Sequence, residues 1–167
     1  MPRDAERPSA GRLTAGHQPL RIDEGEFAGW ESFRDAAFNN ETGPFYHRVD
    51  ESGVLCAFRP TSRNLNNAGS VHGGCLLTMA DFSMYITARL HYGTAELVTV
   101  ALTSQFLGGA RAGQRVEARS EIVLGGRSLT FLRGIMTADG APVLSYSGTF
   151  KRIAGAAETR DDGGAKR

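Results

Sequence analysis

The sequence predicts a single α+β domain in which an antiparallel sheet curls around one long helix. Residues 72–92 (HGGCLLTMADFSMYITARLHY) are apolar almost all round, which is typical of a helix enclosed by other structure. Two strand-like runs separated by a turn at 50–53 precede this helix, and four further strand-like runs follow it. A long apolar helix placed between a hairpin and four strands is buried only if the sheet wraps around it.

Composition narrows the function classes. The 167 residues are 41% hydrophobic, which is enough for one core. The 19 Lys+Arg and 18 Asp+Glu residues leave a net charge of +1, which indicates binding neither to nucleic acid nor to a membrane surface. Neither a signal peptide nor a membrane span is indicated. Cys56 and Cys75 lie in apolar contexts without a CxxC pattern, so we expect free buried thiols and a cytoplasmic location. His17, His47 and His91 have no metal-ligand spacing, and we expect no metal.

The two ends of the chain differ from the middle. Residues 1–22 and 154–167 are rich in small and polar residues without a hydrophobic period, and we expect flexible tails on either side of a domain over 23–153. Near the start of this domain, four aromatic residues recur at roughly helical spacing: Phe27, Trp30, Phe33 and Phe38. This spacing predicts a short amphipathic helix packed against the domain.

Strand-like runs account for the rest of the domain. The first two, 44–49 and 54–60, predict a hairpin. The runs after the long helix are 97–107, 115–124, 128–137 and 142–152, with turn signals at 108–109, 125–126 and 139–140. Read as consecutive hairpins, these runs predict a four-strand meander.

The segment 66–74 (NNAGSVHGG) and the acid that follows it are the strongest functional signal. Gly73 and Gly74 begin the long helix, where backbone N–H groups are unpaired and could hold an oxyanion; the alternative is a glycine pair needed only for tight packing. Asp81 is a carboxylate in an otherwise apolar helix, which is costly unless it is used as a base or nucleophile. The alternative is a structural acid that bonds a neighbouring strand.

Two polar residues beside the glycines have open roles. His72 could be a base, but a bond to nearby backbone that fixes the loop is favoured, because Asp81 already supplies a base. Asn66 could donate its amide to a carbonyl or a water, or it could cap its own loop. No G-x-S-x-G elbow or Cys–His pair is present, so serine and thiol nucleophiles are disfavoured.

The spacing of Gly73 and Asp81 has a consequence for assembly. Eight residues separate them, which on a helix is about 12 Å of rise, too far for one carboxylate to reach a carbonyl held at the other end. If two such helices lie antiparallel across a two-fold axis, Asp81 of one chain faces Gly73 of the other. We therefore expect an obligate homodimer, and a homotetramer built from two dimers remains open.

The pattern Asn66-x-x-Gly69-x-x-His72-Gly73-Gly74 with Asp81 resembles the signature of hotdog-fold acyl-CoA thioesterases of the PaaI-like, phenylacetic acid degradation type. The resemblance covers roughly residues 42–152 and implies a curved hotdog sheet around one central helix. In that family the Asp is nucleophile or general base, the first Gly after the His supplies the oxyanion N–H, and the Asn orients the thioester or the water. Here these roles imply Asp81, Gly73 and Asn66, with Thr99 assisting the water.

The same resemblance implies that the loops at 107–111 and 124–129 contact coenzyme A. The implied substrate-binding residues are His72, Gly74, Leu107, Arg111, Gly126, Arg127 and Ser128. Coenzyme A is part of the substrate, so no separate cofactor is expected. The sequence departs from the family at Gly108-Gly109-Ala110, where relatives commonly carry a Pro-containing loop.

We therefore expect an enzyme that hydrolyses an aromatic or medium-chain acyl-CoA to the free acid and coenzyme A. Whether Asp81 attacks the thioester directly or activates a water stays open. One alternative is a non-catalytic acyl-CoA sensor that keeps the fold without the reaction. A hotdog hydratase or dehydratase is less favoured, because it needs a histidine placed to move a proton on the acyl chain.

Overall fold

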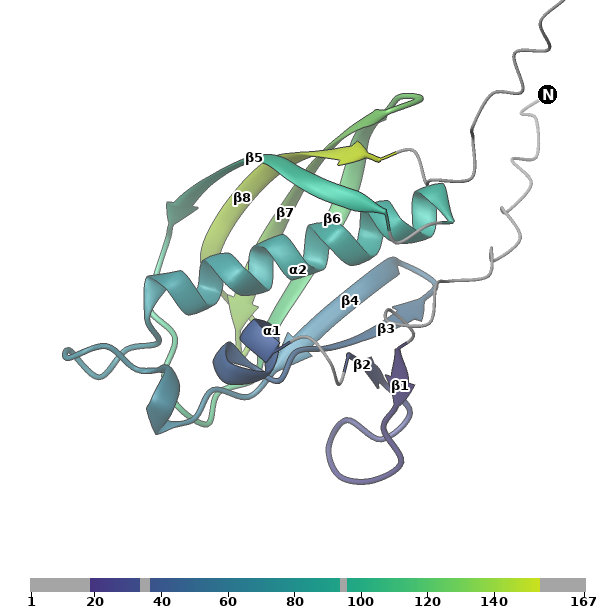
Figure 1. The fold of residues 1–167 in the computed structure, drawn as a ribbon. Coiled ribbons are helices and arrows are strands. Elements are labelled where there is room, and N and C mark those ends of the chain that lie inside the picture. The colour runs from purple at the N-terminus through teal and green to yellow at the C-terminus, as the bar shows by residue number, and fades with distance from the viewer. Residues whose placement is uncertain (1–18, 34–36, 94–95, 154–167) are drawn as a thin grey trace, which may run out of the picture.

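A computed structural model describes residues 19–33, 37–93 and 96–153. Its elements are β1 (Leu20–Arg21), β2 (Glu31–Ser32), α1 (Ala37–Thr42), β3 (Tyr46–Asp50), β4 (Gly53–Phe58), the 3-10 turn η1 (Ser62–Asn64), α2 (Gly73–Tyr92), β5 (Leu97–Phe106), β6 (Val116–Gly125), β7 (Leu129–Ala138) and β8 (Ala141–Arg152). The sheet curves around α2, which runs along its concave face (Figure 1). The predicted α+β architecture, with one long helix inside a curled antiparallel sheet, is confirmed.

The order of the strands corrects the predicted meander. The sheet runs β1-β2-β3-β4-β6-β7-β8-β5, with every neighbouring pair antiparallel. β5 and β6 therefore do not form a hairpin: β5 pairs with β8 at the far edge, and β6 pairs with β4. The physical reason is that α2 crosses the concave face and delivers the chain to the opposite edge from β4. Residues 107–115 then return to the middle of the sheet.

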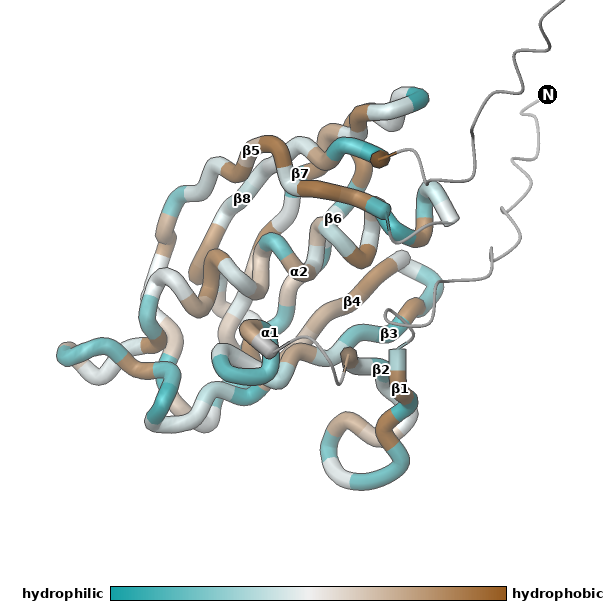
Figure 2. Tube along the Cα trace, in the orientation of Figure 1, coloured by the Kyte–Doolittle hydropathy of each residue, from teal (hydrophilic) through white to brown (hydrophobic). Residues whose placement is uncertain are grey.

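Helix α2 lies at the centre of the core. His72 caps its start, and Gly93, with φ of +65°, ends it in the left-handed conformation that favours glycine. Its buried side chains pack against the inner face of the sheet, whose hydrophobic strands β4 and β5 stand out in Figure 2. One stripe of α2 stays only half buried: Leu77, Thr78, Asp81 and Tyr85. No helix in the described part of the chain is long and apolar enough to cross a membrane.

The predicted amphipathic helix over residues 27–38 is wrong. Gly25 and Gly29 adopt positive φ angles of +81° and +83°, and the N–H of Gly29 donates to the carbonyl of Ile22 over 2.8 Å, which closes a loop. The helix α1 begins only at Ala37, and Phe38 within it is 68% exposed. The aromatic residues have the spacing of one helix face, but the left-handed backbone conformation of Gly25 and Gly29 is incompatible with a helix.

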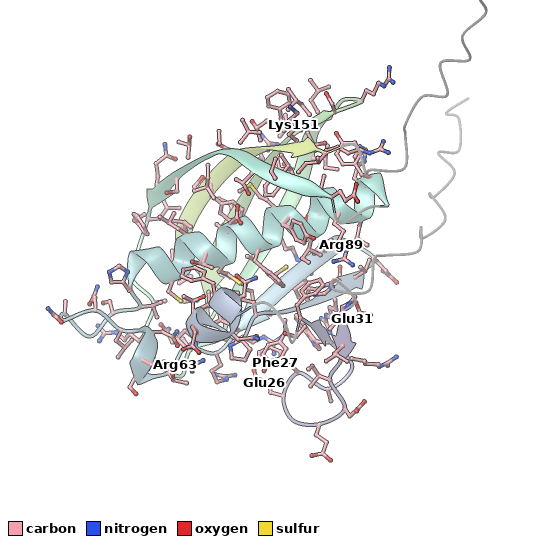
Figure 3. The ribbon with its side chains drawn as sticks, viewed as in Figure 1. Glu26, Phe27, Glu31, Arg63, Arg89 and Lys151 are labelled. Atoms are coloured by element: carbon pink, nitrogen blue, oxygen red, sulfur yellow. The ribbon has the colours of Figure 1, made fainter. Side chains whose placement is uncertain are left out.

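The loop that replaces this helix still packs against the domain, on the outer face of the sheet. Phe27 and Trp30 are buried against Leu55 and Ala57, which are side chains of β4 that point away from α2. Figure 3 shows Phe27 beneath the sheet, on the side away from the helix. The strand β1, which pairs with β2, falls inside the predicted tail over 1–22; residues 1–18 and the predicted tail over 154–167 lie outside the described part.

Candidate active site

Asp81 is held by strand β5. The hydroxyl of Thr99 donates a hydrogen bond of 2.7 Å to Oδ1 of Asp81. Burial raises the pKa of the Asp81 carboxyl above its ordinary value, and the Thr99 hydrogen bond opposes that shift because it stabilises the ionised form. The geometry thus pairs two residues that the sequence placed eighteen positions apart, and it keeps the carboxylate on the half-exposed stripe of α2. A carboxylate in that position is able to accept a proton or attack a carbonyl.

The first turn of α2 leaves one N–H available. The imidazole Nδ1 of His72 accepts the Gly74 N–H over 2.9 Å, and the carbonyl of His72 accepts the N–H groups of Cys75 and Leu76. Among the described residues, no acceptor pairs with the N–H of Gly73. An unpaired N–H at a helix N-terminus is suited to hold a developing oxyanion. The arrangement separates the two glycines: the Gly73 donor is available, whereas that of Gly74 is occupied.

Asn66 closes the loop before α2. Its side-chain oxygen accepts the N–H groups of Ala68 at 2.9 Å and Ser70 at 3.2 Å, the capping geometry that the sequence left open. Sequence reasoning passed over a second asparagine, the buried Asn64. Its amide donates to the carbonyl of Thr42, and its backbone carbonyl accepts the N–H of His72. Burial of an asparagine next to the motif is not visible in the sequence pattern alone.

The two predicted coenzyme A loops lie at opposite ends of α2. Loop 107–111 is joined to the start of the helix, because the Val71 N–H donates to the Ala110 carbonyl over 2.8 Å. The turn that carries Gly126, Arg127 and Ser128 is joined to the end of the helix, where the Tyr92 hydroxyl donates to the Gly126 carbonyl over 2.7 Å. A helix of 20 residues is about 30 Å long, so one chain does not bring the two loops together.

Gly73 and Asp81 are likewise not brought together within one chain. Both lie on the same side of α2, separated by about 12 Å of helical rise. Arg111 and Arg127 are exposed, as is Leu107, so these three side chains are accessible to a ligand. A site that uses both the Gly73 donor and the Asp81 carboxylate therefore needs a second chain.

Neither cysteine provides an alternative nucleophile. Cys56 and Cys75 are free and buried, as predicted from their apolar contexts. Burial raises the pKa of the Cys75 thiol to about 11 and that of Cys56 to about 12, so both stay protonated at neutral pH. In the described part of the chain, no three His, Cys, Asp or Glu side chains gather closely enough to hold a metal ion.

Replacing Thr99 should change the pH dependence of any Asp81-dependent reaction. The Thr99 hydrogen bond lowers the pKa of Asp81, so Thr99→Val should raise that pKa. The acidic limb of a profile of kcat/KM against pH should then move to higher pH, because more of the carboxyl is protonated at a given pH. Thr99→Ser keeps a hydroxyl and should follow the wild-type profile. Superimposable profiles for the valine variant and the wild type would show that this bond does not tune the carboxylate.

Comparisons with known proteins identify the family. Residues 68–144 match the family model described as Thioesterase superfamily. Over 120 residues, which cover 71% of this chain and 90% of the relative, the sequence is 31% identical to Pseudomonas aeruginosa PA0474, whose name provisionally classes it as an esterase. The chain belongs to the thioesterase superfamily. The predicted resemblance to hotdog thioesterases is thereby confirmed. As a member of this superfamily, the protein is a thioester hydrolase.

Solved structures place this thioesterase in the hotdog fold. The PaaI protein of the Escherichia coli phenylacetic acid degradation operon is 22% identical, with a TM-score of 0.63 over 72% of this chain and 86% of that chain. A mutant form of the phenylacetic acid degradation protein PaaI from Thermus thermophilus is 23% identical, with a TM-score of 0.62 over 70% and 99%. A Streptococcus pneumoniae hypothetical thioesterase, solved with coenzyme A, is 20% identical, with a TM-score of 0.56 over 65% and 91%. The predicted hotdog fold is confirmed.

Proposed function

We propose that this thioesterase hydrolyses the thioester of an aromatic or medium-chain acyl-CoA, at two sites formed between the chains of a homodimer. The observation that carries the proposal is the carboxylate of Asp81, held by Thr99 on the half-exposed stripe of α2 that also contains the free Gly73 donor. The solved thioesterase with bound coenzyme A supports coenzyme A as the carrier.

The proposed reaction uses one group from each chain. The Gly73 N–H donates to the thioester carbonyl oxygen and stabilises the negative charge that forms there. Asp81 of the other chain takes a proton from water while the water oxygen attacks the carbonyl carbon. The C–S bond then breaks, and the proton held by Asp81 passes to the leaving sulfur, so that coenzyme A leaves as the thiol and the acyl group as the acid. Direct attack by Asp81 leads to the same products through an anhydride that water opens.

The surface of α2 supports a second copy of this chain as the partner. A two-fold axis through the middle of the Gly73–Asp81 interval passes beside Leu77, a half-buried apolar residue on the same stripe. The antiparallel arrangement also places loop 107–111 of one chain toward the far end of the other chain's α2, where the turn over 125–128 lies. The two predicted coenzyme A loops, far apart in one chain, then flank one substrate.

Mixing two inactive variants tests the shared site. Asp81→Asn removes the carboxylate, and Gly73→Val adds three carbon atoms beside the donor, the first of which would lie 2.9 Å from the Phe106 ring. A mixed dimer keeps one site with an intact Gly73 and an intact Asp81. After unfolding and refolding together in equal amounts, about a quarter of wild-type thiol release should return, since half of the dimers are mixed and each has one of two sites.

Two further measurements give this experiment its controls. Each variant refolded alone should stay inactive, and size-exclusion chromatography with light scattering should give a dimer or a multiple of it. Failure of the mixture to recover activity, with mixed dimers present by mass spectrometry, would show that Gly73 and Asp81 do not form one site across the two chains. If acyl-CoA binds to the wild type and no thiol is released, the protein is an acyl-CoA sensor.

A further inference from the structure

Phe106, at the end of β5, lies against the glycine that begins α2. A Cβ built on Gly73 would be 2.9 Å from Cζ of Phe106 and 3.2 Å from its Cε1, and the three nearest atoms all belong to this ring. A side chain at this position would therefore require the ring to shift. Because the Gly73 Cα is one bond from the amide nitrogen, the ring also lies beside the N–H donor.

A bulge in β5 lets one strand present both Thr99 and Phe106 to the helix. Side chains alternate along a strand, so two residues seven positions apart would normally point to opposite faces. The pairing of β5 with β8 shifts between Thr99 and Ala101, which inserts one extra residue, Val100. As a result Thr99 lies opposite the buried Phe150, and Phe106 opposite the buried Leu144, both on the face that covers α2.

The Phe106 ring keeps a large free surface. Its side chain faces the helix side of the sheet, yet the residue is 55% exposed, whereas its partner Leu144 is fully buried. An aromatic ring with one part against Gly73 and the rest open has apolar surface left to cover a ligand. A thioester oxygen bonded to the Gly73 N–H lies about 2.9 Å from that nitrogen, so the carbon atoms next to the carbonyl come close to the ring.

We propose that Phe106 determines acyl specificity by forming one wall of the pocket for the carbon next to the thioester carbonyl. An unbranched CH₂ group at this carbon packs against the ring, whereas a branch would collide with it. The substrate class is thus acyl-CoA with an unbranched carbon next to the carbonyl. The inference rests on the proposed role of the Gly73 N–H, and it adds a residue that the sequence motif did not contain.

The test compares hexanoyl-CoA with its 2-methyl analogue on the full-length protein. For the wild type, kcat/KM for hexanoyl-CoA should be at least about tenfold higher than kcat/KM for 2-methylhexanoyl-CoA. This is the discrimination that one misplaced methyl group typically gives. Phe106→Ala should reduce this preference to within about threefold. The control is Phe131→Ala, which removes a 42% exposed phenylalanine from β7, and it should keep the wild-type preference.

An equal preference in the wild type and Phe106→Ala would overturn the assignment, as would the same change in Phe131→Ala. Failure of the proposed hydrolysis gives a different result, in which the wild type releases no thiol from either substrate. In that case the role of Phe106 is tested by binding alone. Both thioesters are titrated calorimetrically into Asp81→Asn and into the double variant Asp81→Asn/Phe106→Ala. The Kd values should favour hexanoyl-CoA in the first protein and lose most of that preference in the second. A Gly73→Ala change should also lower the Tm less in Phe106→Ala than in the wild type.

Discussion

Asp81→Asn should lower thioester turnover by about a thousandfold, the middle of the range for loss of a proton-transferring side chain. The substitution keeps the shape of the side chain, and the Thr99 hydroxyl can still donate to the remaining carbonyl oxygen. What is lost is the negative charge that accepts a proton or attacks the thioester. The measurement is thiol release from hexanoyl- and phenylacetyl-CoA under saturating conditions, with wild type and variant prepared side by side.

The same variant should not lose stability. Because burial raises the pKa of Asp81 in the folded chain, the folded state binds its proton more tightly than the unfolded state, and ionisation at neutral pH opposes folding. Removing the charge should leave the Tm unchanged or slightly higher. Asp50→Asn is the matched control: it breaks the 2.6 Å ion pair with Arg119 on the outer face and should leave turnover intact. Comparable turnover in Asp81→Asn and the wild type would remove Asp81 from the reaction.

Gly134→Ala should destabilise the domain by about 3 kcal/mol, a cost typical of forcing an atom into a filled core. A Cβ at this position would lie 2.5 Å from the Tyr146 hydroxyl oxygen and still closer to the Tyr146 ring and the Arg119 carbonyl. The ring crosses Gly134 so that its hydroxyl reaches Ser120 over 3.0 Å and Ser83 of α2 over 3.3 Å. Displacing Tyr146 therefore loosens the link between the sheet and the helix that carries Asp81.

Thermal unfolding measures this effect, with a Tm about 10 °C below the wild type expected for a chain of this size. Gly109→Ala is the control, since its nearest neighbour would be Ser70 Oγ at an ordinary 3.4 Å. Tyr146→Phe separates the ring from the hydroxyl. It should cost only about 1 kcal/mol, because Ser83 and Ser120 still pair at 2.8 Å. A Gly134→Ala Tm equal to that of the control would mean that the ring moves aside without cost.

Local signals were enough to predict the central helix and to single out its candidate functional residues. The apolar run 72–92 gave α2 to within one residue at its start, and the glycines and Asp81 were visible because a carboxylate is rare in such a run. The different states of the two glycine N–H groups follow from the fold, because the imidazole of His72 accepts the Gly74 N–H and leaves that of Gly73 available. The residues alone left both glycines as donors, and only the family resemblance singled out Gly73.

The wrong predictions concern features that depend on contacts between segments far apart in the sequence. Which edge of the sheet receives β5 depends on the path of α2, so the strands β3 to β8 were predicted but their order was not; the short strands β1 and β2 were missed. Phe27, Trp30 and Phe33 had helical spacing, but Phe27 and Trp30 pack on the outer face of β4, whereas Phe33 contacts Phe82 of α2 on the inner face. The bulge at Val100 is equally invisible, because an extra residue changes the face of a side chain without changing the strand-like composition.

The loop over residues 22–30, which packs Phe27 and Trp30 against the outer face of β4, limits how far the protein can be shortened. The motif-based resemblance begins at about residue 42, so a chain trimmed there would lose Phe27 and Trp30; a chain trimmed to residue 68, where the family match begins, would lose β3 and β4 as well. In the chain trimmed to residue 42, Leu55 and Ala57 would face water and form an apolar surface of the kind that drives aggregation. The smallest unit able to fold cleanly is therefore larger than the segment that the family model matches.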